Sequence, residues 1–157
     1  MANENSDLAM FLSNKGYDVI PFIVNAAGLL LVDVKVNGNH GLFILDTGAG
    51  TTVIEQNHVE RLSLVLQHDN AEFSGAGAGG GGLQVIPSTG NTVEIGNHLL
   101  TDFTLTVMSF EHVNDALSQA GANEVICGVI GVDILKPGKA IIDYSTMTLF
   151  LWSEKSS

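Results

Sequence analysis

A single carboxylate lies at the point where an apolar run meets a tight turn. Residues 43–45 are Phe-Ile-Leu, Asp46, Thr47 and Gly48 follow, and the chain is apolar again from Val53. A carboxylate at the end of an apolar run is costly to bury unless it is hydrogen-bonded or shares a proton. Gly48 has no Cβ and lets the backbone turn sharply, while the Thr47 hydroxyl both donates and accepts. The segment predicts a strand–loop–strand that presents Asp46 in a sheltered, preorganised position. The alternative is an ordinary turn capped by the Asp46 side chain.

Short apolar runs separated by turns continue along the chain and indicate a β protein. Within residues 29–36, Val32, Val34 and Val36 alternate with Asp33 and Lys35, the period of two that is typical of a half-buried strand. Asn37-Gly38-Asn39 then forms a hairpin signal. Further strands are expected at 19–24, 42–45, 92–95, 103–107, 125–129, 140–144 and 148–152. The pattern predicts a mostly-β domain, a closed barrel or sandwich, with one or two short helices.

Helical spacing is confined to short segments. Residues 111–121 are the best helix candidate, because apolar side chains recur at i, i+3, i+4 and i+7 and Gly121 stands at the C-cap position. One helical turn is expected at 132–135 and another at 8–12, and Val59 and Leu62 suggest a short surface helix. The predicted organisation is a loose polar lead-in at 1–18, one domain at 19–153 and a tail at 154–157.

Composition excludes several classes of function. Six Lys and Arg stand against seventeen Asp and Glu, for a net charge of −11, and Arg61 is the only arginine. The chain therefore lacks the basic footprint of a nucleic-acid-binding protein. It also lacks an apolar run of about 18 residues, so no membrane span is expected. Residues 1–17 do not have the pattern of a signal peptide. The cytoplasm is therefore favoured, and a periplasmic or secreted protein would need a signal peptide ahead of this sequence.

Three other features have a chemical and a structural interpretation. Cys127, the only cysteine, could be a nucleophile, but its apolar surroundings favour a buried structural thiol. The five histidines are scattered without metal-ligand spacing and are expected at the surface. The glycines of residues 75–80 match a dinucleotide-binding pattern, but no helix-forming segment follows them, so a flexible loop is favoured. Neither a metal nor a cofactor is expected.

The Asp46-Thr47-Gly48 triplet and a second motif together resemble the retropepsin-like aspartic peptidases of the single-domain bacterial and cellular type. The second motif spans residues 129–135 and contains Ile130, Gly131 and Asp133. In that family two apolar residues and a glycine lead into a short helix that ends in leucine, and the strand passes behind the aspartate loop. Asp133 is expected to accept backbone hydrogen bonds, a structural role. The resemblance covers roughly residues 19–152 and implies a retropepsin-like barrel.

The resemblance also implies a reaction. Aspartic peptidases use two carboxylates that share one proton, one as the base for water and one as the acid that polarises the scissile carbonyl. Because this chain has one triplet, Asp46, Thr47 and Gly48 are the predicted catalytic residues of a homodimer that cleaves extended polypeptides. The glycine tract between the two motifs takes the place of the flap that covers the substrate: Gly75, Gly77, Gly79, Gly80, Gly81 and Gly82.

Two departures from the retroviral pattern qualify this prediction. Gly50 and Val132 stand where many retroviral members carry an aspartate and an arginine that form an ion pair, so a dimer of this chain must be held differently.

The second hypothesis is a dimeric peptide-binding or scaffolding module with weak or no hydrolysis. The intact triplet speaks against that hypothesis, because a carboxylate buried twice in a dimer without use would be costly.

Overall fold

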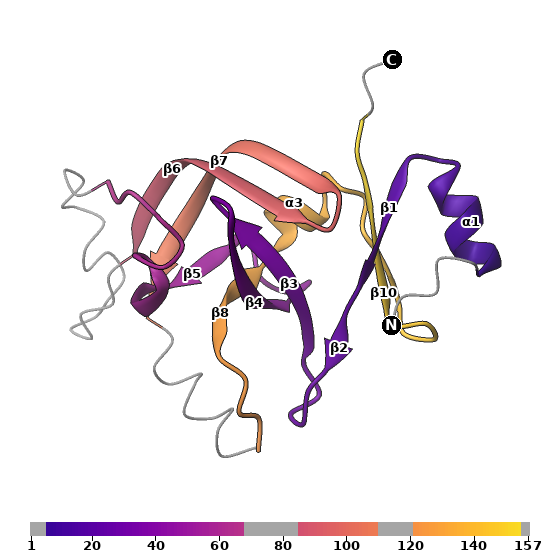
Figure 1. The fold of residues 1–157 in the computed structure, drawn as a ribbon, viewed down its shortest axis with the longest axis horizontal. Helices are drawn as coiled ribbons and strands as arrows, with labels where there is room; N and C mark the ends of the chain where they lie inside the picture. The colour runs from indigo at the N-terminus through magenta and orange to yellow at the C-terminus, as the bar shows by residue number, and fades with distance from the viewer. Residues whose placement is uncertain (1–5, 68–84, 110–120, 155–157) are drawn as a thin grey trace.

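Six strands of the computed structural model close into a β-barrel, which confirms the predicted mostly-β class (Figure 1). The structure describes residues 6–67, 85–109 and 121–154. The barrel strands are β3 (Leu30–Val36), β4 (Asn39–Leu45), β8 (Ile126–Ile130), β5 (Val53–Glu55), β7 (His98–Met108) and β6 (Ile86–Ile95), in spatial order. Pairing of Lys35 with Glu94 and of Val36 with Val93 joins β6 back to β3 and closes the barrel. The short strand β2 (Ile23–Val24) pairs with the other half of the same β3 edge.

The sequence explains why β3 and β4 form a hairpin. The apolar residues of β3 at positions 30, 31, 32, 34 and 36 are buried, whereas Asp33 is exposed. Asn37 and Gly38 both have positive φ, 51° and 85°, the conformation that a tight hairpin turn requires. The hairpin delivers β4 in antiparallel register, and Asp46 follows its last residue.

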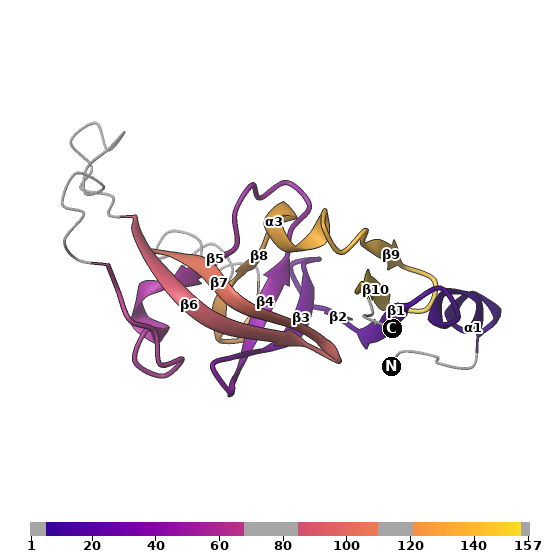
Figure 2. The ribbon, with the colours of Figure 1, turned by 90° about the horizontal axis from the view of Figure 1, so that it is seen from above.

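A second sheet joins the two ends of the chain. It contains β1 (Tyr17–Pro21), β10 (Thr148–Trp152) and β9 (Ile141–Asp143) in that order. Figures 1 and 2 show this terminal sheet beside the barrel. The predicted closing hairpin at 140–152 is thus present as β9 and β10. Asp143 caps its turn by accepting hydrogen bonds from the Ser145 and Thr146 hydroxyls, at 2.6 and 2.8 Å, and these bonds lower the pKa of its carboxyl group.

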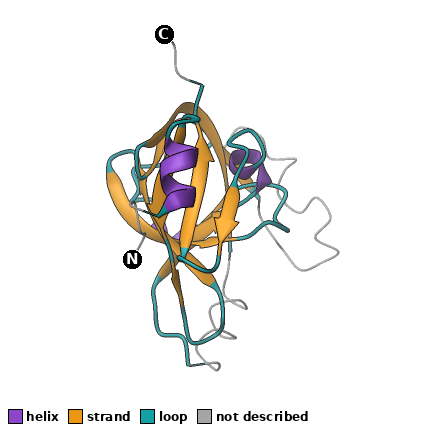
Figure 3. Cartoon of the chain, turned by 90° about the vertical axis from the view of Figure 1, so that its right-hand side faces the viewer, coloured by secondary structure: helices purple, strands orange, loops and turns teal. Residues whose placement is uncertain are grey.

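The segment expected as a loose lead-in contains a docked helix, which corrects that expectation. Ser6 is the N-cap of helix α1 (Asp7–Ser13), and its hydroxyl accepts a hydrogen bond from the Ala9 N–H at 3.1 Å. Ala9 and Leu12 are buried against Phe150 of β10, with Tyr17 and Val19 at the edge of the cluster. Figure 3 shows α1 lying across the outer face of the terminal sheet. The apolar spacing within 8–12 therefore marked a helix with a packing partner.

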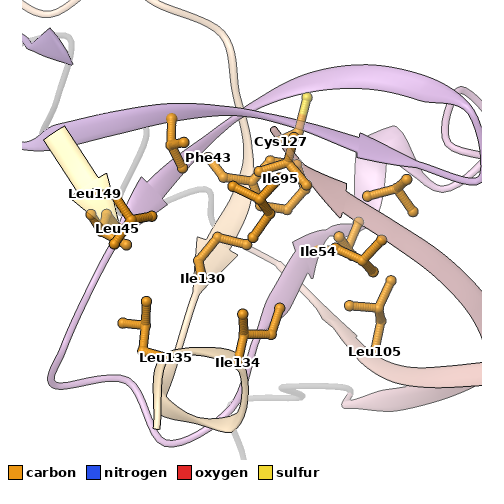
Figure 4. Packing of buried hydrophobic residues seen from close by; sticks show 14 of the residues in the cluster. Phe43, Leu45, Ile54, Ile95, Leu105, Cys127, Ile130, Ile134, Leu135 and Leu149 are labelled. Carbon is orange, nitrogen blue, oxygen red and sulfur yellow. The ribbon is translucent and has the colours of Figure 1, made fainter. Parts of the chain in front are cut away.

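The main core fills the barrel and extends under the terminal sheet (Figure 4). Phe43, Ile54, Ile95 and Ile130 are fully buried there. Cys127 is also buried, which confirms a packed thiol. Its Sγ takes the space that a side chain at Gly41 would fill, because a Cβ there would lie 2.9 Å from the sulfur.

Two predicted helical segments are present, one with its predicted bounds and one shifted. The 132–135 turn is helix α3 (Val132–Leu135), and the expected helix around Val59 begins earlier as the 3-10 helix η1 (Gln56–His58) and continues in turns. The predicted helix at 111–121 lies largely outside the described residues. No helix within the described ranges is long and apolar enough to cross a membrane.

Candidate functional site

Asp46 stands at the carboxyl end of β4 in a loop held by its own side chain. The Gly48 N–H donates to Asp46 Oδ1 at 2.8 Å, and the Ala49 N–H donates to the Asp46 carbonyl at 3.2 Å. A Cβ at position 48 would lie 3.3 Å from the carboxylate oxygen, tighter than most contacts, so glycine leaves room for this hydrogen bond. The carboxylate is therefore preorganised, as predicted. It is not sheltered, because Asp46, Thr47 and Gly48 are all exposed in the single chain.

The second motif lies directly behind this loop. The Asp46 N–H donates to the Ile130 carbonyl at 3.0 Å, and the Val132 N–H donates to the Ala49 carbonyl at 2.8 Å. The first bond joins the loop to the last residue of β8, and the second joins it to the first residue of α3 (Val132–Leu135). The structure thus brings Ile130, Gly131 and Asp133 to the Asp46 loop, although they are far from it in sequence.

Gly131 permits the close approach of the two segments. A Cβ at this position would lie 2.7 Å from the Ala49 carbonyl oxygen and 2.8 Å from the Thr51 carbonyl oxygen. Both obstacles are backbone atoms, which cannot rotate away as a flexible side chain would. The glycine is therefore required by packing against the loop, and its extended φ of −107° carries no strain.

Thr52 and Asp133 join the far end of the loop to helix α3. The Thr52 hydroxyl donates to Asp133 Oδ1 at 2.6 Å, and the Thr52 N–H donates to Oδ2 at 2.9 Å. The same hydroxyl accepts from the Gly131 N–H at 3.0 Å. The predicted structural role of Asp133 as an acceptor is thus what the structure contains. Sequence reasoning missed Thr52. Its only signal was that a hydroxyl side chain stands at the point where the chain becomes apolar again.

An apolar hollow adjoins Thr47. Its volume is about 390 Å³, and helix α3 and strand β9 form its walls. The lining is Thr47, Val132, Leu135, Lys136, Lys139, Ala140 and Ile142. The exposed Thr47 hydroxyl is therefore flanked by apolar surface, with two lysines at its border.

The remaining predicted site residues are not all placed. The flap glycines between 75 and 82 lie outside the described residues. Within the described ranges, no group of three or more His, Cys, Asp or Glu side chains is arranged to hold a metal ion.

One histidine contradicts the expectation of a surface position. His98, at the start of β7, is buried, and its Nδ1 lies 2.8 Å from Ser153 Oγ and 3.9 Å from Asp18 Oδ2. Burial lowers the pKa of His98 below its usual 6.5, and the nearby Asp18 carboxylate opposes that shift. The side chain joins the β6–β7 hairpin to the terminal sheet.

Comparison with protein families gives one match over more than half of the chain. Residues 32–137 match the model of the family described as gag-polyprotein putative aspartyl protease. The matched segment contains both the Asp46 loop and the second motif. Among curated protein sequences, none matches the chain.

Solved structures are similar to this chain at low sequence identity, and the first of the following shares its fold. The retroviral protease-like domain of Ddi1 from Leishmania major superposes with a TM-score of 0.55 at 17% identity, over 78% of this chain and 87% of that one. A retropepsin-like aspartic protease from Rickettsia conorii gives a TM-score of 0.49 at 19% identity, over 87% and 88% of the two chains. EIAV protease, complexed with the inhibitor HBY-793, gives 0.46 at 21% identity, over 69% and 86%.

Proposed function

Because the chain belongs to the gag-polyprotein putative aspartyl protease family, we propose that it is an aspartic endopeptidase that works as a homodimer. The observation that carries this proposal is the Asp46 loop. Its carboxylate is oriented by the Gly48 N–H and is exposed in the single chain, and the loop is supported from behind by Ile130 and Asp133. A preorganised and accessible carboxylate is what a general base requires.

One chain supplies half of the site. Two carboxylates must share a proton for this chemistry, and the sequence contains one Asp-Thr-Gly triplet. A two-fold axis beside Asp46 would bring the second copy's Asp46 next to the first. The apolar hollow beside Thr47 supports such a contact, since it offers surface that a partner would cover.

In the proposed reaction the ionised Asp46 removes a proton from water while the water oxygen bonds to the scissile carbonyl carbon. The protonated Asp46 of the second copy donates its proton to the carbonyl oxygen, which gives a neutral tetrahedral diol. The dyad then returns a proton to the amide nitrogen and takes a proton from the diol. The carbon–nitrogen bond breaks as these protons move. The dyad ends with one proton, as it began, and no metal or cofactor is needed.

The test is cleavage of an unfolded protein substrate by the wild type and by Asp46→Asn. We expect the variant to lose hydrolysis and to keep its unfolding temperature, because the amide retains the shape of the carboxylate but cannot act as its base. Asp102 is also an exposed aspartate, and it lies on β7. Asp102→Asn is therefore the matched control and should cleave at the wild-type rate.

Sedimentation of the same samples checks the dimer. A monomer that cleaves at full rate would contradict the shared dyad, and cleavage by Asp46→Asn would place the chemistry elsewhere. A dimer that binds extended peptides without cleaving them would support the second hypothesis, a peptide-binding or scaffolding module.

A further inference from the structure

A second hollow lies at the opposite end of the strands that carry the Asp46 loop. It has a volume of about 410 Å³ and is lined by Asp33, His40, Gly41, Leu42, His58, Arg61 and Val125. Gly41 and Leu42 are near the start of β4, and Val125 immediately precedes β8. Because Asp46 and Gly131 follow the last residues of these two parallel strands, the strands separate this hollow from the Asp46 loop. Figure 1 shows the same direction, with β8 running toward α3.

The only arginine of this acidic chain is fixed at the hollow. One Arg61 terminal nitrogen donates to the buried Cys127 Sγ at 3.0 Å, and the other donates to the His40 carbonyl at 2.6 Å. A guanidinium has five N–H donors, so three remain for a ligand or water beyond these two bonds within the described chain. The two anchoring bonds hold the planar donor group in one orientation, which reduces the ordering cost of binding.

Among the described residues that line the hollow, Arg61 is the only lysine or arginine. Asp33 is the carboxylate in the lining, and its Oδ2 lies 2.8 Å from His40 Nδ1. This contact directs Asp33 toward His40. His58 adds a second imidazole to the wall. The described lining therefore presents one guanidinium and two imidazoles against one paired carboxylate.

The remaining wall is apolar. Leu42 is half-buried, and Val125 is 66% exposed at the rim. An apolar side chain this exposed gains by contact with a ligand's hydrocarbon part.

We propose that this hollow binds a carboxylate ligand that has a short apolar group. The carboxylate contacts the Arg61 guanidinium, whose donor geometry matches two carboxylate oxygens, and the apolar group packs on Leu42 and Val125. A small branched carboxylic acid and the C-terminal residue of a polypeptide both have this chemistry. The site is independent of hydrolysis at Asp46.

The test uses isovalerate as the probe and isovaleramide as its uncharged match. Binding is followed by the NMR resonances of the His40 and His58 rings in the full chain, in the Asp46→Asn background so that the result does not depend on peptidase activity. We expect saturable shifts with isovalerate and none with the amide. Equal shifts with both compounds, or shifts with neither at millimolar concentrations, would overturn the proposal.

Two substitutions locate the contact. Arg61→Gln should weaken isovalerate binding by about tenfold or more, as loss of a charge-assisted hydrogen bond predicts. Because Arg61 also contacts Cys127, Val125→Asp provides a variant at an exposed position, and its carboxylate should repel the ligand. Val65→Asp, at a 71% exposed valine outside the lining, is the matched control and should bind as wild type. Equal binding by Val125→Asp and Val65→Asp would place the ligand elsewhere.

Two peptides then identify the source of the carboxylate. Acetyl-Ala-Val with a free C-terminus is compared with its C-terminal amide on the same resonances. Tighter binding of the free acid than of isovalerate indicates a polypeptide terminus, and binding no tighter than isovalerate indicates a small carboxylic acid. Binding of the peptide amide as strong as that of the peptide acid would contradict recognition of a carboxylate.

Discussion

Thr52 has more connections than its position in the sequence suggests. One hydroxyl group donates to Asp133 and accepts from Gly131, and the Thr52 backbone donates to the same carboxylate. Thr52 is completely buried, so a loss of any of these bonds would leave a polar group away from water. The end of the Asp46 loop is thereby fixed to α3 by side-chain chemistry as well as by strand pairing.

We predict that Thr52→Val destabilises the protein by about 1–3 kcal/mol, the usual cost of an unsatisfied buried polar group. Valine keeps the shape of threonine but leaves Asp133 Oδ1 and the Gly131 N–H without the hydroxyl. Thr52→Ser keeps the hydroxyl and loses one methyl group, at about 0.8 kcal/mol. Urea unfolding of both variants measures the difference. A valine variant as stable as the serine variant would show that the hydroxyl contributes little.

The burial of His98 gives the fold a pH dependence. Its pKa in the folded protein is lowered by burial from the usual 6.5. The unfolded chain therefore binds this proton more readily than the folded chain does, and protonation favours unfolding. The stabilising contribution of neutral His98 is complete above about pH 6.5 and declines as the pH falls through that value toward the lower folded pKa.

We predict that His98→Asn removes this part of the pH dependence. Asparagine can place a polar atom near the position of Nδ1 and so retain contact with Ser153, but it does not titrate. The free energy of unfolding, measured by urea titration between about pH 7.5 and 5, should decline less steeply for the variant. The other histidines are the same in both proteins and cancel in the comparison. Parallel curves would contradict a lowered pKa at His98.

At the scale of elements, the loop after β4 and the turn before α3 pack backbone against backbone. Glycine is needed at Gly131 because the Ala49 and Thr51 carbonyl oxygens occupy the space of a side chain. Gly50 lies in the same loop, but a Cβ there would meet no atom within 4 Å, and its φ is not positive. The two glycines therefore offer a direct test of which contact holds the elements together.

We predict that Gly131→Ala lowers the unfolding temperature and costs about 1–3 kcal/mol or more, as other overpacked sites do. Gly50→Ala should lie within about 0.5 kcal/mol of the wild type, or slightly above it, because alanine reduces the freedom of the unfolded chain. Thermal unfolding monitored by circular dichroism distinguishes them. Similar unfolding temperatures for the two variants would refute the close contact at Gly131.

At the scale of the whole molecule, the described chain is one barrel, one terminal sheet and the helix α1 that covers the sheet's outer face. The chain ends pair with each other through β1 and β10, so the barrel and both ends are one packed unit. Each chain has a net charge of −11. Two copies that meet at the Asp46 loops must overcome the repulsion between these charges.

We predict that added salt strengthens the proposed dimer. The Debye length shortens from about 30 Å at 0.01 M salt to about 10 Å at 0.1 M, so the repulsion between two acidic chains is screened. Sedimentation equilibrium across this range should give a dimer dissociation constant that decreases with salt. An increase would instead indicate that ion pairs between the copies, such as contacts of Lys136 and Lys139, hold the dimer.

Much of the fold and of the candidate site could be predicted from local pattern. The alternation in 32–36, the hairpin at Asn37 and Gly38 and the abrupt turn at Asp46 depend on neighbours in sequence, and all three are present. These three features were accessible because strand periodicity and turn chemistry act over a few residues. The position of the segment around Gly131 behind the Asp46 loop was implied instead by the resemblance to the retropepsin-like family.

The tertiary structure alone decided how segments far apart in sequence meet. Four features depend on residues from distant elements. They are the exposure of Asp46, the hydroxyl contacts of Thr52, the burial of His98 and the docking of α1 on Phe150. A polar residue's sequence neighbours do not reveal whether a distant carboxylate or apolar face will cover it. The sequence by itself therefore determined the strands and the turn at Asp46, because these follow from local conformation and periodicity. Burial and long-range hydrogen bonds were decided only when the barrel closed and the terminal sheet packed beside it, because both depend on which distant surfaces come into contact.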